Sequence, residues 1–187
     1  GELNFVLGCT EISAGCMHCY ARKIMERSGR DFHDVRHYFG KLAKLRAFNW
    51  DRLLWAVQTG NAEPWRRGTK CKPLAFVVDM GDLFHEAVPD NFIMEAFVTM
   101  RDLNMVDFQV LTKRPDRACD VIYELFGEQG LPNNIWFGVT AEHQNALAAR
   151  MYWLRKIKAA VRFLSCEPLL EEISLVRDLG VLDWVIV

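Results

Sequence analysis

Residues 108–140 read FQVLTKRPDRACDVIYELFGEQGLPNNIWFGVT and contain one complete strand–helix–strand unit. The runs 108–112 and 135–140 have the length and the β-branched and aromatic content of buried strands. Between them, residues 115–126 place apolar side chains at helical spacing behind Pro115, and proline is favoured at the first position of a helix. This order predicts two parallel strands joined by a helix.

The same alternation extends along most of the chain. Further apolar runs lie at 4–7, 74–79, 161–165 and 184–187, and further helical patterns lie at 20–27, 90–103 and 142–157. Runs such as 75–78 and 184–187 are almost wholly apolar, which is typical of parallel strands covered on both faces. We therefore expect an α/β fold, a (β/α) barrel or partial barrel of TIM type, with a single domain over residues 1–187.

Two segments depart from this rhythm. Residues 30–73 contain Trp50, Trp55 and Trp65 among many basic residues, with loop signals at Pro64 and Gly68, and are interpreted as a mostly helical insertion after the first helix. The last apolar run, 184–187, has nothing after it to cover it, so we expect the barrel to be C-terminally truncated.

Composition restricts the partners. The 187 residues carry 23 Lys and Arg against 24 Asp and Glu, a net charge of −1, so the overall balance gives no sign of a nucleic-acid or anionic-membrane partner. No signal peptide and no apolar run of about 20 residues is present, so we expect no membrane contact and a cytoplasmic location. In a reducing cytosol, clustered cysteines indicate a metal site more than disulfides.

Three cysteines near the start, Cys9, Cys16 and Cys19, form a C-x6-C-x2-C motif. Soft thiolates select iron–sulfur clusters or zinc. A structural zinc ion normally takes four protein ligands, whereas three thiolates leave one metal position free, which favours a reactive cluster. His18 would complete a Cys3His zinc site, although simultaneous ligation on so tight a loop is strained. Cys71 and Cys119 have no partner at ligand spacing and are assigned to packing.

Polar residues follow the expected strands, at the edge where parallel sheets collect their ligands. These candidates are Met80, Asp82 and His85 after the second strand, Lys113 and Arg114 after the third, Thr140 and Glu142 after the fourth, and Cys166 and Glu167 after the fifth. Most have a local alternative: helix capping for Asp82 and Thr140, a place in the first helical turn for Glu142, a solvated turn for the basic pair, and a buried structural thiol for Cys166. The local alternative for His85 is a role in helix capping or local hydrogen bonds.

Several motifs together resemble a known family. Gly8-Cys9-Thr10, the stretch 13–21 (SAGCMHCYA), the stretch 81–85 (GDLFH), the stretch 109–115 (QVLTKRP) and the stretch 165–169 (SCEPL) look like the phage Gp37/Gp68 family (DUF5131), which is radical-SAM-like. The resemblance covers nearly the whole chain. The radical S-adenosylmethionine superfamily usually has C-x3-C-x2-C, so the longer first gap here is a departure, while the C-x2-C-Tyr-Ala end is similar to that of spore photoproduct lyases.

The resemblance implies a fold and a chemistry. It implies a six-stranded partial barrel and a [4Fe–4S] cluster on Cys9, Cys16 and Cys19 that binds S-adenosylmethionine. One electron, from a donor such as flavodoxin or ferredoxin, would cleave this cofactor to a 5′-deoxyadenosyl radical. The implied cofactor-binding residues are Met80, Asp82, Lys113, Thr140 and Glu142. The implied catalytic residues are Cys166 as hydrogen-atom donor, Glu167 as substrate anchor and His85 as proton donor or polar anchor.

A second hypothesis comes from a different class of protein. In it, zinc or an inert cluster only orders the N-terminal loop, and the insertion contacts nucleic acid through Trp65, Arg66, Arg67 and Lys70. Nucleic acid is also a candidate substrate under the first hypothesis. The two hypotheses differ in whether the metal keeps an exchangeable position to which S-adenosylmethionine binds.

Overall fold

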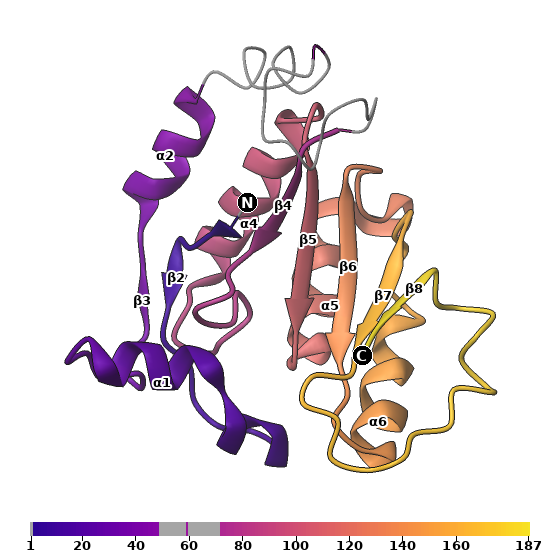
Figure 1. Cartoon of the computed structure of the whole chain (residues 1–187). Coiled ribbons are helices and arrows are strands. Elements are labelled where there is room, and N and C mark those ends of the chain that lie inside the picture. The colour runs from indigo at the N-terminus through magenta and orange to yellow at the C-terminus, as the bar shows by residue number, and fades with distance from the viewer. Residues whose placement is uncertain (1, 49–58, 60–71) are drawn as a thin grey trace.

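The computed structural model describes residues 2–48, 59 and 72–187 and has an α/β architecture built on one parallel sheet (Figure 1). Its six strands lie in chain order: β1 (Glu2–Leu3), β4 (Leu74–Val77), β5 (Asp107–Thr112), β6 (Ile135–Thr140), β7 (Arg162–Ser165) and β8 (Trp184–Ile186). All five pairings are parallel. The sheet stays open among the described residues, with β1 and β8 as its edges, so the α/β class is confirmed and a closed barrel is not formed.

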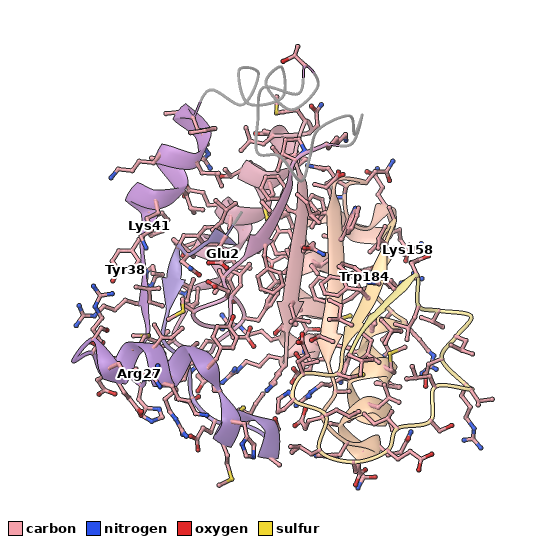
Figure 2. The ribbon with its side chains drawn as sticks, in the orientation of Figure 1. Glu2, Arg27, Tyr38, Lys41, Lys158 and Trp184 are labelled. Atoms are coloured by element: carbon pink, nitrogen blue, oxygen red, sulfur yellow. The ribbon has the colours of Figure 1, made fainter. Side chains whose placement is uncertain are left out.

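Three helices connect the central strands and lie against one face of the sheet (Figure 1). They are α4 (Asp90–Asp102), α5 (Pro115–Phe126) and α6 (Gln144–Leu154), and a short 3-10 helix, η3 (Gly127–Gln129), follows α5. Figure 2 shows side chains filling the space between helices and sheet. Aromatic rings form the centre of this layer, where Phe84 lies 6.0 Å from both Phe97 and Phe137 between ring centroids. Residues 166–183, between β7 and β8, are irregular with turns at 176–181 and contain no helix.

The N-terminal segment corrects one predicted strand. Residues 4–7 were expected to form the first strand of the main sheet, but β1 covers Glu2–Leu3, and β2 (Val6–Leu7) turns away to pair antiparallel with β3 (Arg36–His37). Asn4 lies at the break, where its side-chain oxygen accepts a hydrogen bond from the Met80 backbone N–H at 3.1 Å. This side-chain bond takes the place of a ladder bond, so the chain leaves the sheet here.

The cysteine segment and the described part of the insertion follow β2. They form η1 (Ala14–His18), a 3-10 helix, then α1 (Tyr20–Arg27), β3 and α2 (Phe39–Ala47). The expected mostly helical insertion, 30–73, therefore has one strand and one helix in its described part, and Trp50, Trp55 and Trp65 lie outside the described residues. In the described part of the chain, no helix is long and apolar enough to cross a membrane.

Candidate functional site

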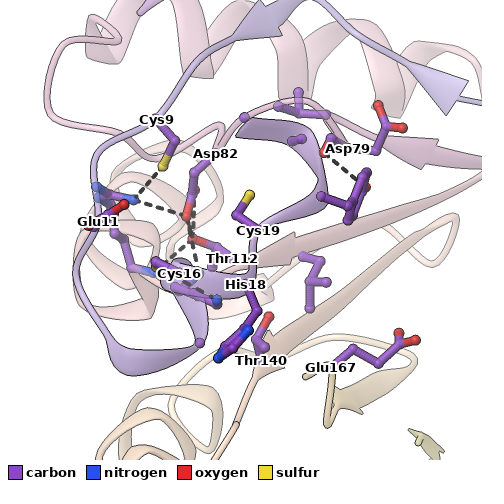
Figure 3. A pocket seen from close by; sticks show the side chains of 18 of the residues that line it. Cys9, Glu11, Cys16, His18, Cys19, Asp79, Asp82, Thr112, Thr140 and Glu167 are labelled. Atoms are coloured by element: carbon purple, nitrogen blue, oxygen red, sulfur yellow. Dashed lines mark hydrogen bonds and ion pairs between the residues drawn. The ribbon is translucent and has the colours of Figure 1, made fainter. Parts of the chain in front are cut away.

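A cavity of about 360 Å³ lies at the carboxyl ends of the strands, where the cysteine loop meets the loops that follow the main sheet (Figure 3). Its polar and sulfur-bearing lining comes from five segments: Cys9, Thr10, Glu11, Cys16, His18, Cys19 and Tyr20; Asp79 and Asp82; Thr112, Lys113 and Arg114; Thr140; and Glu167. The prediction that polar strand ends share one edge with the cysteines is confirmed for Asp82, Lys113, Arg114, Thr140 and Glu167.

Two glycines allow the cysteine loop to approach the sheet closely. Gly8 has a φ of +88°, a conformation that favours glycine, and it forms an isolated parallel bridge with Gly81. The Gly8 N–H donates to the Met80 carbonyl at 2.9 Å. A Cβ on Gly81 would lie 2.7 Å from the Gly8 carbonyl oxygen, so a side chain there would push the loop away. The position of Cys9 therefore depends on a direct backbone contact with the loop after β4.

Cys9 lies beside a buried guanidinium group. Arg114, at the end of the β5 loop, donates from Nη1 to the Cys9 Sγ at 3.3 Å. The same side chain donates from Nη2 to the Thr10 carbonyl at 3.2 Å and to the Thr10 hydroxyl at 3.0 Å. Burial and the charge of Asp82 raise the pKa of the Cys9 thiol to about 11, with Arg114 acting in the opposite direction.

Cys16 and Cys19 have different surroundings. The Cys16 Sγ lies 3.6 Å from the Ser13 hydroxyl and accepts from Lys113 Nζ at 3.8 Å. Burial acts to raise the pKa of Cys16, but hydrogen bonds from Ile12 and Ser13 and the charge of Lys113 outweigh it, so this pKa lies below its ordinary value. Cys19 is half-buried, precedes the first residue of α1 and also borders the cavity.

The three thiols share a cavity wall without forming a closed ligand set. Among the described residues, no group of three or more His, Cys, Asp or Glu side chains is arranged to hold a metal ion. His18, the alternative zinc ligand, borders the same cavity as the three cysteines. The chain therefore brings all four side chains to one place, but not to metal–ligand distance.

Asp82 is the centre of a buried hydrogen-bond network. Its carboxylate accepts from the Thr112 hydroxyl at 2.8 Å, from the Lys113 N–H at 3.1 Å and from the Phe84 N–H at 2.9 Å, and Arg114 Nη1 lies 3.4 Å away. Four donors occupy most of the acceptor capacity of one carboxylate. Asp82, predicted to contact a cofactor, thus already binds the β4 and β5 loops to each other.

Asp79 was missed by the sequence reasoning, which selected its neighbours. It borders the cavity, and its Oδ1 atom is buried with no hydrogen-bond partner among the described residues. Its backbone carbonyl accepts from the Tyr20 hydroxyl at 2.9 Å. The charge of Asp79 raises the pKa of nearby Glu2. An unpartnered buried oxygen is costly, and a donor from a bound molecule would satisfy it.

Glu142 does not border the cavity but supports the cysteine loop from behind. Its side chain is 0% exposed and forms an ion pair with Arg150, whose Nη1 lies 2.6 Å from Oε2 and also donates to the Thr140 carbonyl at 2.7 Å. Burial favours protonation, but hydrogen bonds from Arg150 and Ser13 hold the pKa of Glu142 at about 2. A Cβ on Gly15 would lie 3.2 Å from the Glu142 Cβ, so the loop rests directly on this side chain.

His85 also lies behind the cavity wall. Its Nδ1 accepts from the Ala87 N–H at 3.0 Å, so in the neutral ring the proton is on Nε2, which donates to the Thr10 hydroxyl at 2.8 Å. Burial, followed by the charge of Arg114, lowers the pKa of His85. The side chain is 3% exposed and holds Thr10 beside Cys9.

The remaining predicted residues divide between the cavity and the core. Thr140, Lys113 and Glu167 border the cavity. Cys166 is 4% exposed and belongs to the main hydrophobic core, while Met80 packs against a small cluster formed by Ala21, Met25 and Phe32. Neither Cys166 nor Met80 is among the residues that border the cavity.

Comparison with known proteins gives one family. A family model described as "Protein of unknown function (DUF5131)" matches residues 2–187. No curated protein and no solved structure matches the chain. Since the family model covers nearly the whole sequence, the chain belongs to the DUF5131 family.

Proposed function

We propose that this protein is a radical-SAM-like enzyme that holds a [4Fe–4S] cluster on Cys9, Cys16 and Cys19 and binds S-adenosylmethionine in the adjoining cavity. The observation that carries the proposal is the convergence of the three thiols on one cavity at the carboxyl ends of a parallel sheet. Its volume, about 360 Å³, lies within the range of about 300–1,000 Å³ that is usual for small-molecule sites.

The chemistry of the donors fits such a cluster. Cysteine thiolates are the common ligands of [4Fe–4S] clusters, and three of them leave one iron open for a further ligand. Two cations stand next to the sulfur atoms, Arg114 at 3.3 Å from Cys9 and Lys113 at 3.8 Å from Cys16, and both offset the negative charge of thiolates. When bound, the cluster would supply the electron that cleaves S-adenosylmethionine reductively, with a flavodoxin or ferredoxin as donor.

The chain's own side chains would then bind and orient the cofactor. Asp79 offers a buried oxygen that has no hydrogen-bond partner in the described part of the chain, which suits the ammonium group of the methionine part of the cofactor. Asp82 is better suited to holding the loops in place, because its oxygens already have donors. Thr140 and Glu167, elsewhere on the cavity wall, are available for hydrogen bonds to polar groups of the cofactor or substrate.

The test is anaerobic reconstitution with iron and sulfide, followed by absorption and EPR spectra with and without S-adenosylmethionine. We expect about four irons per chain and an EPR signal of the reduced protein that changes when the cofactor is added. The variant Cys16→Ser should lose the cluster. The matched control Cys119→Ser should keep it, because that thiol lies on α5 and does not border the cavity. A cluster that does not respond to the cofactor would contradict the proposal.

A second candidate function is a zinc-stapled binding module without catalysis. It is favoured by His18, which borders the cavity together with the three cysteines and completes a Cys3His donor set. Stoichiometric zinc in the purified protein, released in both Cys16→Ser and His18→Ala, would support it. Its proposed nucleic-acid contacts, Trp65, Arg66, Arg67 and Lys70, lie outside the described residues.

A further inference from the structure

We infer that Arg114 is a positioning residue that orients Cys9 and raises the reduction potential of the metal cluster held there. The inference rests on the proposed function, because it requires a cluster on Cys9. It goes further by assigning to one buried side chain the control of how easily that cluster accepts an electron.

The position of Arg114 allows it to connect three segments at once. Arg114 is 8% exposed, and its guanidinium group donates to the Cys9 sulfur at 3.3 Å and to the Thr10 carbonyl and hydroxyl at 3.2 and 3.0 Å. Two carboxylates contact the guanidinium, Asp82 at 3.4 Å from Nη1 and Glu86 at 3.4 Å from Nε. A planar group with five donors can satisfy these partners together, which a single ammonium cannot do.

Two physical effects of Arg114 act in the same direction on the potential. A hydrogen bond to a ligating sulfur withdraws electron density and favours the reduced, more negative cluster. The guanidinium also compensates the charge of Asp82, a carboxylate that borders the same cavity. Without Arg114, Cys9 would lose its donor and face an uncompensated negative charge. Both changes make reduction harder.

Arg117 provides a matched control three positions further along the chain. It is also an arginine that binds the loop after β4, donating to the Phe84 carbonyl at 3.4 Å and to the Val88 carbonyl at 2.6 Å. It also pairs with Asp90. None of the contacts described for Arg117 involves a cysteine, so its removal disturbs the same loop without touching the sulfur atoms.

The experiment measures the midpoint potential of the reconstituted full chain by EPR-monitored redox titration, together with iron content. We expect Arg114→Gln to shift the potential to a more negative value, Arg114→Lys to shift it less, and Arg117→Gln to leave it at the wild-type value. If Arg114→Gln does not fold or does not bind a cluster, the test rests on Arg114→Lys. A midpoint potential more negative than that of the wild type then supports the inference, and an unchanged midpoint potential overturns it.

The outcomes separate the two proposals. A wild-type chain that holds no cluster overturns both the proposed function and the role of Arg114. A wild-type cluster that responds to S-adenosylmethionine, combined with unchanged potentials in both Arg114 variants at full iron content, leaves the proposed function standing and overturns the inference. An equal shift in Arg117→Gln would assign the effect to the loop as a whole and also overturn it.

Discussion

Arg150→Met should destabilise the protein more than the loss of an ordinary surface charge, because it leaves Glu142 charged and buried. Arg150 Nη1 lies 2.6 Å from the Glu142 Oε2, and the Glu142 side chain is 0% exposed. The other carboxylate oxygen, Oε1, already lacks a hydrogen-bond partner among the described residues. Methionine keeps the apolar stem of arginine, so the substitution mainly removes the charge and its hydrogen bonds.

The expected cost follows from the geometry of the pair. Removing one partner of a buried ion pair typically costs about 3–5 kcal/mol, because the remaining charge loses its partner without gaining water. Another basic side chain near Glu142 is His143, whose Nε2 lies 4.0 Å from Oε1. The Thr140 carbonyl also loses the hydrogen bond that Arg150 donates at 2.7 Å, which adds about 1 kcal/mol. We therefore expect the free energy of unfolding at pH 7 to fall by at least about 3 kcal/mol.

The same pair predicts a pH dependence. The pKa of Glu142 is about 2 in the folded protein, below its ordinary value of 4.5, so its stabilising contribution is complete above about pH 4.5 and is lost as the pH falls toward 2. This contribution amounts to about 3 kcal/mol at pH 7 and decreases by about 2 kcal/mol at pH 3. In Arg150→Met, the pKa of Glu142 should rise, because the ion pair is lost while the burial of the carboxylate remains. The difference in stability between wild type and variant should therefore be smaller at pH 3 than at pH 7.

Urea denaturation at both pH values tests this reasoning, with Lys158→Met as the control. Lys158 pairs with Glu128 at 3.4 Å, but both side chains are more than half exposed, so its loss should cost about 1 kcal/mol or less. The reasoning is refuted if Arg150→Met costs no more than Lys158→Met at pH 7. It is also refuted if the cost of Arg150→Met does not decrease on acidification.

Three other changes test the packing and the cavity. Gly138→Ala would place a Cβ 2.5 Å from the buried Phe163 ring. This overpacking should lower the free energy of unfolding by about 1–3 kcal/mol in urea titrations. An unchanged urea midpoint would contradict this packing. Asn134→Ala removes an amide that donates to three backbone carbonyls, the closest at 2.8 Å. We expect the free energy of unfolding to fall by about 1–3 kcal/mol and the Tm to fall by several degrees. An unchanged Tm would argue against these hydrogen bonds. Asp79→Asn should weaken S-adenosylmethionine binding about tenfold in calorimetry of the cluster-loaded protein, with iron content unchanged. If the variant and the wild type bind S-adenosylmethionine with equal affinity, Asp79 is not part of the proposed site.

Periodicity located the central elements because each of them buries one clear apolar face. The segments 20–27, 115–126 and 135–140 have the predicted bounds. The first strand was misplaced because residues 2–7 supply two strands of only two residues each, too short to show a period. The side chain of Asn4 decides where the chain leaves the sheet, and its partner is 76 positions away, so local sequence cannot show it.

The location of the site was predictable, whereas the partners within it were not. Parallel topology places the loops after successive strands at one edge, and this rule brought Lys113, Thr140 and Glu167 to the cavity with the cysteines. The contact between Arg114 and Cys9 joins residues 105 positions apart, and no spacing rule predicts it. Glu142 was predicted to face the cofactor because it follows a strand end, but Arg150, two helical turns further on, binds its carboxylate in the core.

The cysteine loop is fixed at several points that do not involve a metal. Gly8 is bound to the loop after β4, Thr10 accepts from Arg114 and His85, and Gly15 rests on Glu142. These anchors come from the loops after β4, β5 and β6, the same loops that line the cavity. A metal bound by the thiols would therefore draw sulfur atoms together against a backbone that the loops after the strands already hold. Loss of Arg114, which contacts the Cys9 sulfur directly, should therefore change how the site binds metal, whereas loss of Arg150, which acts through the buried Glu142, should mainly lower the stability of the fold.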